Sequence, residues 1–163
     1  MGYNYVVIRH KMVIALDEHI DLSTTEYQAL AEFRYQLRNF LAFSEQAARA
    51  VGLEPQQHQL LLTLKGASAQ EKVTIGDLAD RLKIQHHSAV ELINRVVEHD
   101  LVRRCRDEQD QRRVLVTLTP HGEEVLRRLS LLHRAELRMA GPALVQALQA
   151  IIGNAPVEDT GKE

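Results

Sequence analysis

Residues 103–122 restrict the folds open to this chain more than any other segment. They read RRCRDEQDQRR followed by VLVTLTPHG and contain five arginines. The pattern predicts two antiparallel strands, over 101–106 and 113–119, joined by a charged tip at 107–112. Because this hairpin directly follows two short helical segments, we expect a basic ribbon beside a pair of helices. Such an arrangement can hold a DNA duplex in two grooves at once.

The two helical segments ahead of the hairpin form a helix-turn-helix pattern. Thr74 can cap the first helix, with Asp77 in its first turn, and residues 83–85 make a tight turn. The second helix is expected from about His86 to His99. In a pair of this kind the second helix enters the major groove, where its first turns meet the base edges. Its apolar stripe recurs at helical spacing at Ala89, Leu92, Ile93 and Val96.

The polar side of that second helix is therefore the predicted DNA reader. Histidine and serine can donate or accept hydrogen bonds, glutamate can accept from cytosine, and an arginine one turn further on suits the phosphate backbone. The predicted contacts from this helix are His86, His87, Ser88, Glu91 and Arg95. An arginine at the hairpin tip can enter the minor groove. The predicted contacts from the hairpin are Arg104, Arg106, Asp110, Arg112 and Arg113.

Asp110 and Arg112 are expected to act together at the tip. They are two residues apart, so an extended tip would put both side chains on one face. The carboxylate could then orient the guanidinium toward DNA.

Long helical segments precede this region. Residues 23–26 (STTE) are a capping-box pattern followed by apolar residues at helical spacing, so 24–50 is expected to be one helix that Gly52 ends. Pro55 suits the first turn of the next helix, and Gly66 ends it. The residues expected to bury this second helix are Leu60, Leu61, Leu62 and Leu64.

Helices are also expected after the hairpin. Thr119 and Pro120 open a helix that runs to about Ala140. Gly141 and Pro142 are expected to break it, because proline cannot continue the hydrogen-bond ladder. A short final helix is expected over 144–152.

Composition narrows the classes of function. The net charge of −2 argues against indiscriminate coating of nucleic acid, but specific binding depends on where Lys and Arg lie. Cys105 is the only cysteine, which is consistent with a reducing cytoplasm. No apolar run approaches the roughly 20 residues that span a bilayer, so no membrane partner is expected. The chain shows no glycine-rich phosphate loop, nucleophile elbow or metal-ligand cluster, so we expect no enzyme, cofactor or metal.

Plainer explanations compete with several of these assignments. A run of charges is usually a solvated face, but its position after a helix-turn-helix favours DNA contact. His86 and His87 are either base contacts or ordinary surface histidines. Cys105 is by default a structural residue; as a redox switch it would gain thiolate character from flanking arginines, yet no second cysteine exists to resolve it.

Residues 53–122 resemble the winged helix-turn-helix of the MarR family of transcriptional regulators. The resemblance is carried by IGDLADRL at 75–82, by LINRVVE and LVRR within 92–104, and above all by DEQDQRRVLVTLTPHG at 107–122. It implies a homodimer whose first helix and last two helices form the interface. It also implies that the protein binds a pseudo-palindromic DNA operator, usually as a repressor. The DNA is then released when a small-molecule effector binds, which in the family is often phenolic and here is of unknown identity.

The residue patterns and this resemblance together divide the chain into five parts, in a fold that is mainly α with a small antiparallel β-wing. Residues 1–22 are expected to be an arm that packs on the body or on a partner subunit. Residues 23–52 and 120–152 are expected to be dimerisation helices, around a DNA-binding domain at 53–119. The polar residues 153–163 are expected to be a disordered tail.

Two positions depart from the family pattern. Asp100 stands where relatives often have glycine, and aspartate tolerates that backbone better than most residues. Glu91 stands where relatives are often basic, which bears on the operator sequence more than on the fold. Glu91 and the low net charge favour an alternative function, a winged helix that serves protein interaction or dimerisation. The exposed arginines and the Asp110–Arg112 pair favour DNA.

Overall fold

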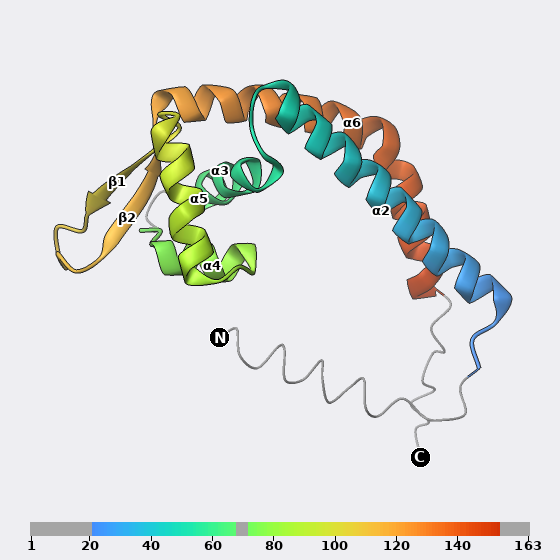
Figure 1. The fold of residues 1–163 in the computed structure, drawn as a ribbon. Helices are drawn as coiled ribbons and strands as arrows, with labels where there is room; N and C mark the ends of the chain where they lie inside the picture. The colour runs from blue at the N-terminus through green and yellow to red at the C-terminus, as the bar shows by residue number, and fades with distance from the viewer. Residues whose placement is uncertain (1–20, 68–71, 154–163) are drawn as a thin grey trace, which may run out of the picture.

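The computed structural model describes residues 21–67 and 72–153. Most of the predicted arm (1–20 of 1–22) and of the predicted tail (154–163 of 153–163) lies outside the described residues. The predicted fold class is confirmed, since helices dominate and one two-stranded antiparallel sheet is present (Figure 1). The elements in chain order are α2 (Thr24–Ala50), α3 (Pro55–Gly66), α4 (Ile75–Leu82), α5 (His86–Glu98), β1 (Val102–Arg106), β2 (Val114–Leu118) and α6 (Pro120–Gly153).

The two longest helices, α2 and α6, lie side by side and carry the smaller elements at one end (Figure 1). α2 begins at the predicted capping box. Ser23 Oγ accepts from the Glu26 backbone N–H at 3.3 Å, and the Glu26 carboxylate accepts from the Ser23 N–H at 2.7 Å. Gly52, with φ of 79°, turns the chain away after the helix ends, as predicted. No helix in the described stretches is long and apolar enough to cross a bilayer.

The predicted break at Gly141–Pro142 is wrong, because α6 continues through both residues to Gly153. Proline inside a helix costs about 3 kcal/mol through the lost hydrogen bond and the ring clash. The helix beyond Pro142 nevertheless packs against α2, where Ala147 is buried and faces Ala29 and Glu32 across a shared crevice. Burial along this contact offsets the cost that the local sequence imposes. One helix therefore stands where two were expected.

A single core joins α2, α3 and α6 to the smaller elements. The apolar stripe predicted for α5 is buried in full, as are Leu60 and Leu61 of α3. The burial predicted for Leu62 is wrong, since this side chain is 49% exposed. Successive residues of a helix point about 100° apart, so a helix that packs on one side cannot bury three consecutive positions. The fourth leucine of the set, Leu64, is buried.

Two left-handed residues shape the chain around α5. Lys83, with φ of 56°, ends α4 and makes the predicted tight turn into α5. Asp100, with φ of 52°, makes the turn from α5 into the hairpin. Aspartate visits this region more readily than most residues, which explains how the chain dispenses with glycine there.

The hairpin forms as predicted, with β1 and β2 antiparallel and Arg104 opposite Val116. Hydrogen bonds join the base of the hairpin to the first turn of α6. Thr119 N donates to the Leu101 carbonyl at 3.1 Å, and Gly122 N donates to Thr119 Oγ1 at 3.0 Å. Gly122 lies so close to Leu101 that an added Cβ would collide with its carbonyl group. The glycine at the end of the 107–122 motif is therefore needed for close approach of backbone to backbone.

Candidate nucleic-acid interface

The predicted reader, α5, turns its polar side to solvent. Burial of the apolar stripe fixes the rotation of the helix about its own axis. Of the residues predicted to contact DNA from this helix, Ser88 is half-buried and four are exposed, namely His86, His87, Glu91 and Arg95. Glu91 Oε2 lies 4.0 Å from Arg95 Nη2, one turn away. This ion pair offsets part of the negative charge that Glu91 places on the face.

The start of α4 is fixed by the cap predicted at Thr74. Thr74 Oγ1 accepts from the Asp77 N–H at 3.2 Å, and the Asp77 carboxylate accepts from the Thr74 N–H at 2.8 Å. Hydrogen bonds from Thr74 hold the pKa of Asp77 below its ordinary value, and the nearby guanidinium of Arg113 acts in the same direction. The hairpin residue Arg113 thus faces the acidic start of α4.

Besides Arg113, which pairs with Asp107, two of the predicted hairpin arginines make contacts inside the protein. Arg104 Nη2 donates to Asn94 Oδ1 at 2.6 Å, which ties β1 to α5. Arg106 Nη1 donates to the Gln111 carbonyl at 3.4 Å, across the tip. Both side chains remain exposed, so they lie at the surface beside α5 with their guanidinium groups partly engaged.

The predicted arrangement of Asp110 and Arg112 is wrong in its geometry. The tip turns at this point, since Arg113 N donates to the Asp110 carbonyl at 2.9 Å. Asp110 Oδ1 accepts from the Arg112 backbone N–H at 3.0 Å and so shapes the turn. The expectation assumed an extended tip, in which the carboxylate would meet the guanidinium. The carboxylate instead fixes the backbone from which the exposed Arg112 side chain projects.

Asp107 was assigned only to the charged tip, yet its side chain is 1% exposed. Its Oδ1 accepts from Lys72 Nζ at 2.7 Å and from the Gln109 N–H at 3.0 Å, and its Oδ2 lies 3.6 Å from Arg113 Nη1. The bond from Lys72, helped by that from Gln109, holds the pKa of Asp107 below its ordinary value. An aspartate directly after a strand often accepts from the backbone N–H two residues further on. This pattern could have marked Asp107 as a residue that shapes the turn.

A groove of about 450 Å³ lies between the start of α4, the start of α5 and the hairpin. Three predicted contact residues, His86, Arg112 and Arg113, line it together. The structure therefore brings the reader helix and the hairpin to one surface, as the sequence predicted. The remaining lining residues are Thr74, Ile75, Gly76, Asp77 and Val114.

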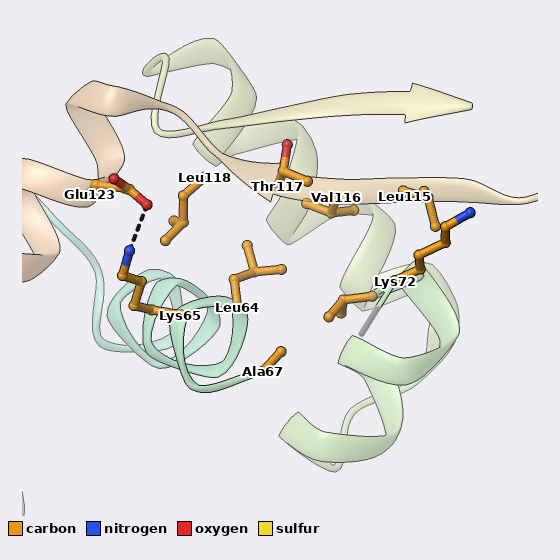
Figure 2. A pocket seen from close by; sticks show the side chains of 10 residues that line it. Leu64, Lys65, Ala67, Lys72, Leu115, Val116, Thr117, Leu118 and Glu123 are labelled. Atoms are coloured by element: carbon orange, nitrogen blue, oxygen red, sulfur yellow. Dashed lines mark hydrogen bonds and ion pairs between the residues drawn. The ribbon is translucent and has the colours of Figure 1, made fainter. Parts of the chain in front are cut away.

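A second cavity, of about 470 Å³, lies between α3 and β2 (Figure 2). Apolar side chains from both elements line it, Leu64 and Val116 among them, with no residue of α5. Lys65 Nζ and Glu123 Oε1, 2.7 Å apart, close one end and tie α3 to α6. This cavity belongs to the packing behind the hairpin and not to the α5 face.

A histidine pair that the sequence did not reveal lies where α2, α3 and α6 meet. The rings of His58 and His133 are 4.7 Å apart between centroids. His133 Nδ1 lies 2.7 Å from the Leu129 carbonyl, to which it can only donate, and Nε2 forms a 2.7 Å hydrogen bond with the Ser44 hydroxyl. Burial, with a smaller effect of His133, lowers the pKa of His58 to about 4. His58 lies three residues before the buried Leu61, a spacing that places it on the apolar side of α3.

A shallow groove of about 390 Å³ opens beside this pair. Phe40 of α2, Leu62 of α3 and Leu137 of α6 supply apolar walls. Arg134 and Arg138 add positive charge at its side. The groove therefore suits a small molecule that has both an apolar body and an anionic group.

Comparison with known proteins gives one consistent result. The sequence profile of the MarR family matches residues 51–113. The transcriptional activatory protein BadR of Rhodopseudomonas palustris is 31% identical over 71% of this chain and 66% of its own length. The crystal structure of AbsC, a MarR family transcriptional regulator from Streptomyces coelicolor, superposes with a TM-score of 0.66 at 25% identity, over 80% of this chain and 90% of AbsC.

The same fold occurs in a protein solved together with DNA. A point mutant of MepR from Staphylococcus aureus, bound to an oligodeoxyribonucleotide, superposes with a TM-score of 0.58 at 22% identity. The match covers 74% of this chain and 84% of that one.

Proposed function

Since this chain belongs to the MarR family of winged helix-turn-helix transcriptional regulators, we propose that two copies of it bind a pseudo-palindromic operator and repress transcription until a small molecule releases them. The observation that carries the proposal is the shared surface of α5 and the hairpin, where His86, Arg112 and Arg113 line one groove. A helix for the major groove and a basic tip for the minor groove are thereby offered to one duplex.

The roles at this interface follow from position. His86, His87, Ser88 and Glu91 lie in the first turns of α5 and are assigned to base edges, and Arg95 to phosphate. From the hairpin, Arg112 and Arg113 are assigned to the groove next to α5. Arg104 and Arg106 are assigned to phosphates, and Asp110 shapes the tip from which Arg112 projects.

Exposed apolar stripes on the long helices support a homodimer. Val145, Leu148 and Ile152 of α6 recur at helical spacing and are 40–64% exposed. A further exposed stripe on α2 consists of Tyr27, Leu30, Leu37 and Leu41. Apolar surface of this extent on helices already packed against each other is expected to be covered by a partner. A second copy also supplies the second reader helix that a two-fold symmetric operator requires.

The groove beside His58 and His133 supports release by an effector. It is bounded by α2 and α6, the proposed dimerisation helices, and by α3 of the DNA-binding part. A molecule bound there can change how these parts are set against each other, and with them the distance between the two reader helices. We propose that the effector is a small aromatic or aliphatic anion whose charged group pairs with Arg134 or Arg138.

The test is selection of bound sequences from random duplex DNA. The expected result is a two-fold symmetric site whose halves lie about one turn apart, roughly 34–36 Å. An enriched site without symmetry would contradict the dimeric arrangement. Absence of any enriched sequence would instead support the alternative, an interaction module, which Glu91 on the reader face and the net charge of −2 favour.

A further inference from the structure

The carboxylate of Asp107 is nearly inaccessible in a part of the chain where its neighbours are exposed. Its side chain is 1% exposed, whereas Glu108, Gln109 and Asp110 are open to solvent. Burying a charge is costly unless it is paired and hydrogen-bonded. Among the described residues no buried side-chain nitrogen or oxygen lacks a partner, and Asp107 satisfies this requirement with two hydrogen bonds and two charged neighbours, since Lys72 donates and also pairs with it and Arg113 lies 3.6 Å away.

These partners come from three separate segments. Lys72 lies just before α4, the Gln109 amide lies in the tip, and Arg113 lies at the start of β2. The backbone adds a fourth link, since Asp107 N donates to the Arg113 carbonyl at 3.0 Å. The carboxylate is therefore the point where both arms of the hairpin meet the connection that leads into α4.

The connection itself is joined to β2 on the same side. Val116 N donates to the Val73 carbonyl at 3.0 Å, and Thr74 and Leu115 form an isolated antiparallel bridge. Because Thr74 also caps α4, a displacement of the tip at Asp107 would be felt where the helix-turn-helix begins. The tip and the start of α4 thus share one anchoring point.

We propose that Asp107 is a positioning residue for DNA binding, which holds the tip at 108–112 in register with α5 without touching the duplex. The inference rests on the proposed function. Asp107 is too buried to reach DNA, and an exposed carboxylate there would repel phosphates. Its contribution to binding runs through the geometry of the tip and of Arg112.

The direction in which one substitution changes the affinity for DNA distinguishes a positioning role from a simple effect of charge. Asp107→Asn removes a negative charge, which by electrostatics alone would strengthen binding to DNA. We expect the reverse, a roughly 10-fold loss of affinity for the duplex enriched from the random pool, because the pairing with Lys72 and Arg113 weakens. The matched control is Glu108→Gln, which removes the same charge from the exposed neighbour and should leave affinity unchanged or slightly higher. An Asp107→Asn protein that binds as tightly as this control would overturn the inference.

A double-mutant cycle distinguishes positioning from general damage. If Asp107 acts through the tip, its substitution should cost less than about 2-fold in protein that already carries Arg112→Ala. Independent, additive losses would show that Asp107 does not act through Arg112.

Hydrogen exchange tests the same point without DNA. In Asp107→Asn the backbone amides of 109–113 should exchange about 10-fold faster than in the wild type, or more, while those of α5 exchange at the wild-type rate. If Asp107→Asn folds poorly, Lys72→Ala is expected to give the same result. Unchanged exchange at the tip in Lys72→Ala would refute the anchoring. If the wild-type chain enriches no duplex, the proposed function fails, and faster exchange confined to the tip would still support the anchoring.

Discussion

Among the glycines that the structure describes, Gly122 is the one at which an added Cβ would collide with backbone, at the base of the hairpin. A Cβ there would lie 2.8 Å from the Leu101 carbonyl carbon and closer still to its oxygen, both of them backbone atoms that cannot rotate away. We expect Gly122→Ala to lower the free energy of unfolding by roughly 3 kcal/mol. Urea denaturation measures this. Gly66→Ala is the control, because its Cβ would meet nothing within 4 Å, and equal effects of the two changes would contradict the argument.

His58 should make stability depend on pH from about pH 6.5 downward, a range that begins above the pH where carboxylates start to be protonated. Burial lowers its folded pKa to about 4, from an ordinary value of 6.5. Below pH 6.5 the unfolded chain gains a proton that the folded chain does not. The stabilisation is therefore complete above pH 6.5 and is lost as the pH falls toward 4. The ring of His133 faces His58 and also opposes a positive charge there, and Arg134 and Arg138 line the adjoining groove.

We expect this group to account for a loss on the order of 2 kcal/mol in the free energy of unfolding between pH 7 and about pH 4.5. His58→Phe keeps a ring against His133 but cannot titrate, so its unfolding free energy should be flatter over the same range. His87→Gln, on the exposed side of α5, should keep the wild-type slope. A parallel slope in His58→Phe would assign the pH dependence to other groups.

At the scale of elements, α6 shows where local sequence and tertiary packing disagree. Pro142 is exposed and lies within the helix, so its replacement removes a local cost without disturbing the core. Pro142→Ala should raise the free energy of unfolding by about 1–2 kcal/mol, since proline's restraint on the unfolded chain offsets part of the gain. Gly141→Ala, whose Cβ would meet nothing, should add only about 0.5–1 kcal/mol. A destabilised Pro142→Ala would indicate that contact with α2 requires the proline.

The sequence was sufficient where one local rule decides the structure. Capping residues located the starts of α2 and α4, and the stripe of α5 predicted which of its residues are buried. It was insufficient where distant segments decide. Continuity of α6 depends on α2, burial of Asp107 depends on Lys72 35 positions away, and the histidine pair joins residues of α3 and α6. The predicted DNA contacts stay predictions, although the surface that they share was anticipated.

At the scale of the whole molecule, the chain concentrates positive charge locally while its net charge is −2. Binding to DNA should then depend on phosphates met by a few arginines of α5 and the hairpin. If each dimer neutralises about 6–10 phosphates, affinity should fall about 10³–10⁵-fold between 50 and 200 mM salt. Fluorescence anisotropy at several salt concentrations gives the slope. A complex insensitive to salt would contradict the assigned arginine contacts.

The exposed stripe of α6 makes the assembly itself testable. Leu148 lies between Val145 and Ile152 on this stripe and is 40% exposed. If a second copy covers the stripe, Leu148→Asp would bury a charge at the interface, and sedimentation equilibrium should show a monomer at concentrations where the wild type is a dimer. Gln149→Asp introduces the same charge at the next exposed residue and should leave the dimer intact. Because two reader helices must meet one operator, the monomer should also lose the steep salt dependence of the dimer. A wild-type chain that stays monomeric at micromolar concentration would remove the basis for both expectations.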